Sequence, residues 1–155
     1  MTRNPVASAA WAVLLTAGVF ISVAQADVIA QRKVVMKGNN DTAEILVSIL
    51  KGETPFDGRT VAVAAYSIAN DFAALRTLVP EGSTGVSSLG DESRAKPEIW
   101  QDMAGFIAAL ENADVAAKAV AATGEANDEG AFKVALGKLG NACDACHEKF
   151  RAPKR

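Results

Sequence analysis

The sequence predicts an all-α fold, an antiparallel up-down-up-down bundle of four helices. Apolar residues recur at intervals of three and four along four separate segments, which is the spacing of one face of a helix. Alanine is abundant, and we find no convincing stretch in which apolar and polar residues alternate as in a strand. Because the connections are mostly short, consecutive helices are expected to lie side by side and antiparallel.

The first 26 residues are predicted to be a cleaved signal peptide (residues 1–26) rather than part of the fold. Arg3 is followed by a mostly apolar run, and Ala-Gln-Ala at 24–26 has the small-residue pattern that signal peptidase recognises. An uncleaved membrane anchor is the alternative, because the apolar run is nearly long enough to span a bilayer. We expect cleavage and export to the periplasm of a Gram-negative bacterium, leaving residues 27–155 as one mature domain without a membrane segment.

The first helix of the mature chain is predicted at residues 27–51. Gly-Asn-Asn at 38–40 weakens a helix, but the apolar face resumes in phase after these residues, so we expect one continuous helix. Gly52 follows in the position that favours left-handed backbone and so ends the helix.

The second helix is predicted at residues 58–78, and either Thr54 or Asp57 can cap its N-terminus. Pro80 ends it, since proline cannot continue a helix. Residues 80–95, rich in glycine, serine and charge, form the one long loop of the prediction.

The third and fourth helices are predicted at residues 97–122 and 127–152. Proline suits the first turn of the third helix, and Gly124 is interpreted as its stop signal. Pro153 and a basic tail end the fourth helix, where positive charge suits the helix dipole.

Composition narrows the class of function. Half of the chain is hydrophobic and its net charge is −2, with no basic surplus or stripe, so nucleic acid is not expected as a partner. We also find no constellation of acid, base and nucleophile of the kind that enzymes use, and we therefore expect a protein that is not an enzyme.

Both cysteines and the only histidine lie within five residues, at Cys143, Cys146 and His147. Cys-x-x-Cys-His is the signature of covalent haem c attachment. Each thiol adds to one vinyl group of haem, and the histidine directly after the second cysteine supplies an imidazole nitrogen to the iron. One motif implies one haem c, held through two thioethers.

Three other interpretations of these residues were weighed. A dithiol oxidoreductase usually carries Cys-x-x-Cys at a strand–helix junction, and no such pattern surrounds the motif. A zinc site needs four ligands, and the chain has no other cysteine or histidine. A plain disulfide suits an exported protein but leaves His147 unexplained. Haem attachment is therefore favoured, and the dithiol oxidoreductase stays as the alternative from the enzyme class.

The sixth ligand of such an iron cannot be a second histidine of the same chain. After removal of the signal peptide only two thioethers remain, Met36 and Met103. In an up-down bundle the starts of the first and third helices lie at the same end as the C-terminus of the fourth, so both methionines can face His147. The residues alone leave this choice open, and core packing is the usual role of either methionine.

Residues 143–151, with 32–37, 51–57 and 96–100, resemble the class II c-type cytochromes, the cytochrome c prime family, over essentially the whole mature chain. The resemblance implies a four-helix bundle with haem between the helices towards one end. It also implies that Arg32 lies near a haem propionate and that Met36 faces the iron. In a low-spin subgroup the methionine at this position is the sixth ligand, whereas in cytochromes c prime proper an apolar residue leaves the iron five-coordinate and high-spin.

Two functions are consistent with these residues. The first is one-electron transfer to periplasmic redox partner proteins, with His147 and Met36 as axial ligands, because a methionine–histidine pair suits an electron carrier. The alternative is a high-spin protein that binds NO or CO at an open iron. The resemblance further implies that a homodimer can form through outer helix faces.

Overall fold

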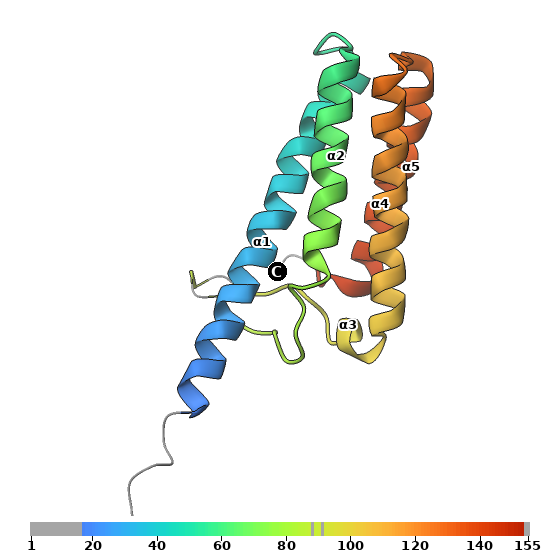
Figure 1. The fold of residues 1–155 in the computed structure, drawn as a ribbon. Helices are drawn as coiled ribbons and strands as arrows, with labels where there is room; N and C mark the ends of the chain where they lie inside the picture. The colour runs from blue at the N-terminus through green and yellow to red at the C-terminus, as the bar shows by residue number, and fades with distance from the viewer. Residues whose placement is uncertain (1–16, 88, 91, 154–155) are drawn as a thin grey trace, which may run out of the picture.

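The computed structural model describes residues 17–87, 89–90 and 92–153, and within them it confirms the all-α prediction. Four long helices run alternately up and down as an antiparallel bundle, with a short fifth helix before the third long one (Figure 1). Their bounds are α1 (Ala17–Leu50), α2 (Gly58–Leu75), α3 (Glu98–Gln101), α4 (Met103–Glu125) and α5 (Glu129–Phe150). In the described ranges the only β-type pairings are two isolated bridges.

Helix α1 is continuous through residues 38–40, as the resumed apolar face predicts. It begins at Ala17, before the predicted start at Asp27, and so runs across the predicted cleavage point. Most of the predicted signal peptide, residues 1–16, lies outside the described residues. Gly52 has a φ of 73°, which is the left-handed conformation expected after the end of this helix.

The predicted third helix is interrupted at Asp102, which separates α3 from α4. The backbone of Asp102 leaves the helical region, with φ −133° and ψ 61°, and its side chain accepts a hydrogen bond from the Gly105 N–H at 2.9 Å. Aspartate competes in this way for backbone donors and therefore starts helices more readily than it continues them.

Gly124 was interpreted as the stop signal of this helix, and that prediction is wrong. Gly124 is buried inside α4, and the left-handed residue after the helix is Asn127, with φ 52°. A Cβ atom on Gly124 would lie 2.5 Å from the Gly58 carbonyl oxygen and 2.6 Å from the Ala62 nitrogen. The glycine therefore lets the backbones of α2 and α4 approach closely.

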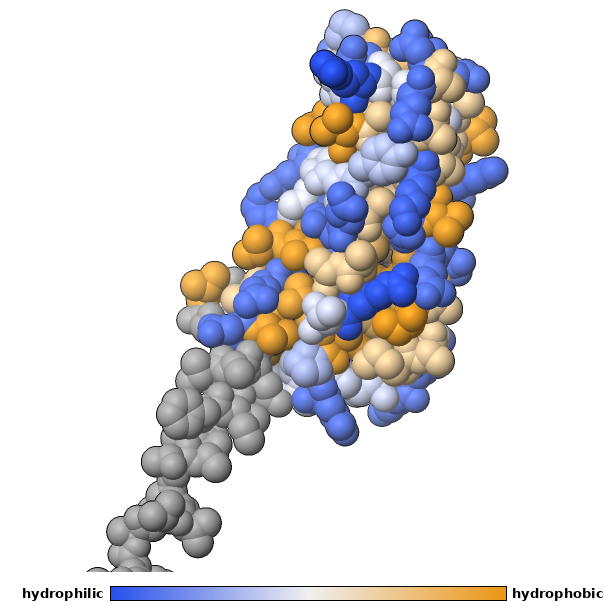
Figure 2. Space-filling model, in the orientation of Figure 1, coloured by the Kyte–Doolittle hydropathy of each residue, from blue (hydrophilic) through white to orange (hydrophobic). Residues whose placement is uncertain are grey.

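The core is built around α2, which packs against both α1 and α4, while α4 also packs against α5. Asp57 caps α2 by accepting a hydrogen bond from the Thr60 N–H, which settles the choice between Thr54 and Asp57. The fully buried side chains include Leu46, Leu110 and Phe132 from three different helices. On the face seen in Figure 2, apolar side chains form small patches between charged and polar ones.

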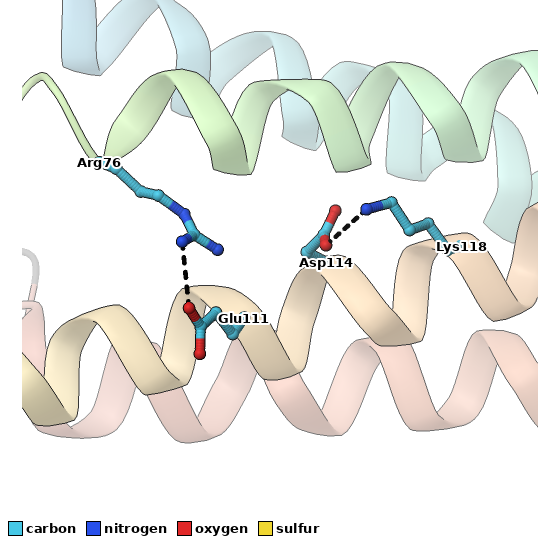
Figure 3. A network of polar contacts seen from close by, with 4 residues as sticks. All are labelled: Arg76, Glu111, Asp114 and Lys118. Atoms are coloured by element: carbon cyan, nitrogen blue, oxygen red, sulfur yellow. Dashed lines mark hydrogen bonds and ion pairs between the residues drawn. The ribbon is translucent and has the colours of Figure 1, made fainter.

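Ion pairs on the outside of the bundle occur both between helices and along a single helix. Arg76, the residue directly after α2, contacts Glu111 of α4 at 3.1 Å, and Lys118 contacts Asp114 along α4 at 2.8 Å (Figure 3). Such exposed pairs contribute little to stability, typically below about 1 kcal/mol each. Within the described ranges, none of the helices combines the length and apolar character needed to cross a membrane.

We expect Asp102→Asn to make the protein less sensitive to acid. The Asp102 carboxylate accepts hydrogen bonds from Lys149 Nζ at 2.6 Å and from the Gly105 N–H. Both hydrogen bonds lower the pKa of Asp102, and the one from Lys149 has the larger effect. A lowered pKa in the folded state stabilises the fold above the usual carboxyl pKa, and this stabilisation is lost as the pH falls through the folded value. Urea unfolding near neutral pH and at about pH 3 measures the difference. An equally steep loss of stability in parent and variant would contradict this role.

Candidate functional site

A cavity of about 500 Å³ opens between α1 and α5, at the end of the bundle where the described chain ends. The first and last helices of an antiparallel four-helix bundle are usually neighbours, yet here they approach each other at almost no point. Arg32 and Met36 form the α1 side of the wall, and Cys146 and His147 form the α5 side. The volume lies within the range of small-molecule and cofactor sites.

The structure brings the three motif residues together on one side of α5. Positions separated by three and four lie on the same helix face, so Cys143, Cys146 and His147 are neighbours. Cys146 is 8% exposed and lines the cavity, while Cys143 is half-buried and packs against the core beside it. Both thiols are free. Cys146 therefore meets the cavity directly, and Cys143 lies one helical turn before it on the same face.

His147 lies half-buried in the wall, and its surroundings favour the neutral imidazole. Burial is the main cause that lowers its pKa, and the positive charges of Arg151 and Arg94 lower it further against the opposing effect of Asp144. Neutral imidazole is the form that binds a metal ion.

Burial raises the pKa of both thiols, and for Cys143 the nearby negative charge of Asp144 adds to the effect. The reactive cysteine of a dithiol oxidoreductase has the opposite property, a lowered pKa that supplies thiolate. The raised pKa values of the two thiols therefore do not favour a dithiol oxidoreductase.

The two methionines left open by the sequence differ in their positions. Met36 lines the cavity from α1, the helix opposite His147. Met103, the first residue of α4, packs against the hydrophobic core and is not part of the cavity wall. A thioether and an imidazole thus meet the same cavity from two helices.

Arg32 is only 8% exposed, and its guanidinium holds the segment that follows α2. One terminal nitrogen donates to the Leu78 carbonyl at 2.9 Å and to Ser83 Oγ at 3.2 Å. The other donates to the Ser83 carbonyl at 2.8 Å and to Ser93 Oγ at 3.1 Å. All four acceptors are neutral oxygens, so none of these hydrogen bonds neutralises the positive charge of the guanidinium.

The same segment, called the strap here (residues 78–87 and 92–97), is also fastened to the chain directly after His147. The Lys96 N–H donates to the Phe150 carbonyl at 3.0 Å, and the Ala152 N–H donates to the Arg94 carbonyl at 2.8 Å. Lys96 Nζ donates to the carbonyls of Glu148 and Lys149, which end α5. The strap therefore connects α1 to the C-terminal end of α5, a role that no local pattern in the sequence indicates.

The chemistry of the wall fits haem c. Two thiols can take up the two vinyl groups, and an imidazole and a thioether are suitable iron ligands. Among the described residues the wall holds five basic residues and two acidic ones, although the chain as a whole has a net charge of −2. A surplus of positive charge suits the two haem carboxylates. The basic residues are Arg32, Lys33, Lys37, Arg94 and Arg151, and the acidic ones are Asp41 and Glu92.

Known proteins resemble this chain over most of its length. The family model for cytochrome c′ matches residues 27–151. A cytochrome c′ of Rhodopseudomonas palustris is 38% identical over 91% of this chain and 92% of its own. A cytochrome c-556 of the same organism is 32% identical over 92% of this chain and 93% of its own.

A solved structure leads to the same group of proteins. The crystal structure of cytochrome c′ from Thermochromatium tepidum superposes with a TM-score of 0.75 at 25% identity, covering 83% of this chain and 97% of that one. Members of the family bind covalently attached haem c, for which this chain has its two cysteines. The chain belongs to the cytochrome c′ family.

Proposed function

We propose that this protein is an exported one-electron carrier whose haem c is attached through Cys143 and Cys146, with His147 and Met36 as the two iron ligands. The observation that carries the proposal is that Met36 of α1 and His147 of α5 line one cavity from opposite helices. The other candidate thioether, Met103, is not part of the cavity wall.

The haem, when bound, supplies an iron that accepts and releases one electron. The two thiols fix the group to α5, and His147 offers an imidazole nitrogen that burial keeps neutral. Met36 offers a soft thioether, a ligand that raises the reduction potential of a c-type cytochrome. With both ligands on helices, their positions differ little between redox states, which suits electron transfer.

The positive charges of the wall are proposed to bind the haem carboxylates. Arg32 is buried, and its four hydrogen bonds go to neutral oxygens, so a carboxylate in the cavity supplies the negative charge that these bonds do not. A charge buried without a partner is costly, which favours this assignment.

Gas binding is the second candidate. The solved nitric oxide complex of a cytochrome c′ variant from Alcaligenes xylosoxidans has the same fold, with a TM-score of 0.73 at 21% identity, covering 83% of this chain and 97% of that one. In that case Met36 covers the distal face without bonding the iron, and NO or CO is the ligand.

Replacing Met36 separates the two candidates. We expect the ferrous parent protein to take up CO poorly, because the thioether occupies the iron, and Met36→Ala to take it up readily and to become high-spin. Met103→Ala, which removes a thioether from the core, is the matched control and keeps the parent spectrum. Rapid CO binding by the parent, with a spectrum that Met36→Ala leaves unchanged, would support the gas-binding function instead.

The proposal also includes export of the protein and its interaction with partner proteins. Processing before Asp27 releases the domain into the periplasm, where it exchanges electrons with redox partner proteins or assembles as a homodimer. N-terminal sequencing of the protein recovered from the periplasm tests the processing step, since the mature chain is expected to begin at Asp27.

A further inference from the structure

The C-terminal end of α5 is closed in a different way from the ends of α1 and α4. The last four carbonyls of a helix have no partner within it and must find one elsewhere. At the end of α4, the N–H groups of Ala126, Asn127 and Asp128, which directly follow the helix, donate to its carbonyls. The end of α1 is closed in the same way by the residues that follow Leu50. The end of α5 depends instead on a residue far away in the sequence.

Lys96 of the strap is the partner of three of these four carbonyls on α5. Its Nζ donates to the carbonyls of Glu148 at 3.2 Å and Lys149 at 2.9 Å, and its backbone N–H donates to the Phe150 carbonyl at 3.0 Å. The fourth carbonyl is that of His147, which accepts from the N–H four positions later at 3.0 Å. A lysine suits this position, because its charge also compensates the negative end of the helix dipole.

The turn that Lys96 holds begins at His147, and no long helix supports it on the side of the cavity. Among the described residues, α4 is the only long helix that packs extensively against α5. Helix α1, on the opposite side of the cavity, approaches α5 at almost no point. The direction of the His147 imidazole follows the backbone of this last turn, so a partner that fixes the turn also fixes the imidazole.

Lys96 is itself held in place. Its side chain is half-buried, and its carbonyl accepts a hydrogen bond from the Ile99 N–H at 3.1 Å, where α3 begins. The preceding residue, Ala95, forms an isolated bridge with Arg151. The rest of the strap is fixed to Arg32, one turn before the Met36 position on α1. Lys96 therefore connects the end of α5 to a segment that is anchored on both sides.

We propose that Lys96 is a positioning residue for the iron ligand His147, which it places by clamping the last turn of α5 to the strap. Lys96 is not among the described residues of the cavity wall, so it acts through the backbone of α5 and not by touching the haem. An imidazole held in the right direction binds the iron more strongly than one on a turn that frays. This inference rests on the proposed haem site.

The test uses the holoprotein in a Met36→Ala background, in which His147 is the only protein ligand of the ferrous iron whether or not Met36 binds it in the parent. The stretching frequency of the iron–imidazole bond, measured by resonance Raman spectroscopy, then reports on the placement of His147. Lys96→Met removes the side-chain donor and keeps the backbone N–H, whereas Lys96→Arg restores a cationic donor. Lys133→Met is the control, because Lys133 lies on α5 in an exposed ion pair with Glu129, outside the cavity wall.

We expect Lys96→Met to lower the iron–imidazole frequency, Lys96→Arg to return it to the value of the background and Lys133→Met to leave it unchanged. An unchanged frequency with Lys96→Met, a shift that Lys96→Arg does not reverse, or an equal shift with Lys133→Met would overturn the proposal. Lys96→Ala, which also lacks the donor, must shift the frequency in the same direction and serves where the methionine variant does not fold. Protein mass reports on haem attachment, and the optical spectrum of the parent reports on ligation by Met36, so failure of the proposed function is seen separately.

Discussion

Arg32→Met is expected to lower the free energy of unfolding of the holoprotein by about 2–4 kcal/mol. The substitution removes four hydrogen bonds and leaves the carbonyl oxygens of Leu78 and Ser83 without their donors. It also frees the strap from α1, so the cavity loses the connection between its two walls. In the proposed haem complex a carboxylate compensates the arginine charge, so little stability is gained by removing that charge. Urea unfolding followed by circular dichroism measures the change.

Two further variants separate charge from hydrogen bonding. Arg32→Lys keeps the positive charge, but a single ammonium group cannot reproduce the planar fork, so we expect most of the loss to remain. Lys118→Met removes an exposed charge that pairs with Asp114 on the same helix, away from the cavity, and is expected to change stability by less than about 0.5 kcal/mol. A loss for Arg32→Met no larger than that for Lys118→Met would contradict the role of Arg32 in holding the strap.

Gly124→Ala is expected to destabilise the bundle by about 3 kcal/mol. The added methyl group would meet backbone atoms of Gly58 and Ala62, which cannot rotate out of the way as a side chain can. Helices α2 and α4 must therefore move apart, and the apolar contacts between them weaken. Thermal or urea unfolding measures the loss.

Gly137→Ala is the control for this effect. Gly137 lies on the exposed side of α5 with no atom within 4 Å of an added Cβ, so the substitution is expected to stabilise the protein by about 0.5–1 kcal/mol through helix propensity. Equal changes at the two glycines would show that close helix packing at Gly124 is not the cause.

The helices could be predicted because their signals are local. Helical spacing of apolar residues, the cap at Asp57 and the left-handed Gly52 are all contained in short stretches of sequence. Gly124 was misinterpreted because a glycine near a helix end looks the same whether it ends the helix or admits a neighbouring backbone. The break at Asp102 was missed since the apolar pattern continues through it.

At the candidate site, too, the features that short stretches of sequence contain could be predicted, and those that depend on distant residues could not. The motif on α5 is contiguous, and the structure brings its Cys146 and His147 to one cavity together with Met36, with Cys143 packed against the core. The partners of Arg32 lie 46 to 61 residues away in the sequence, so no pattern around Arg32 indicates that it holds the strap.

The most direct test of the central claim is the optical spectrum of the purified ferric holoprotein. Ligation of the iron by His147 and Met36 predicts a low-spin spectrum that includes the weak band of an iron–thioether bond. A high-spin ferric spectrum without that band would contradict the proposed electron carrier and indicate an iron whose distal position is open.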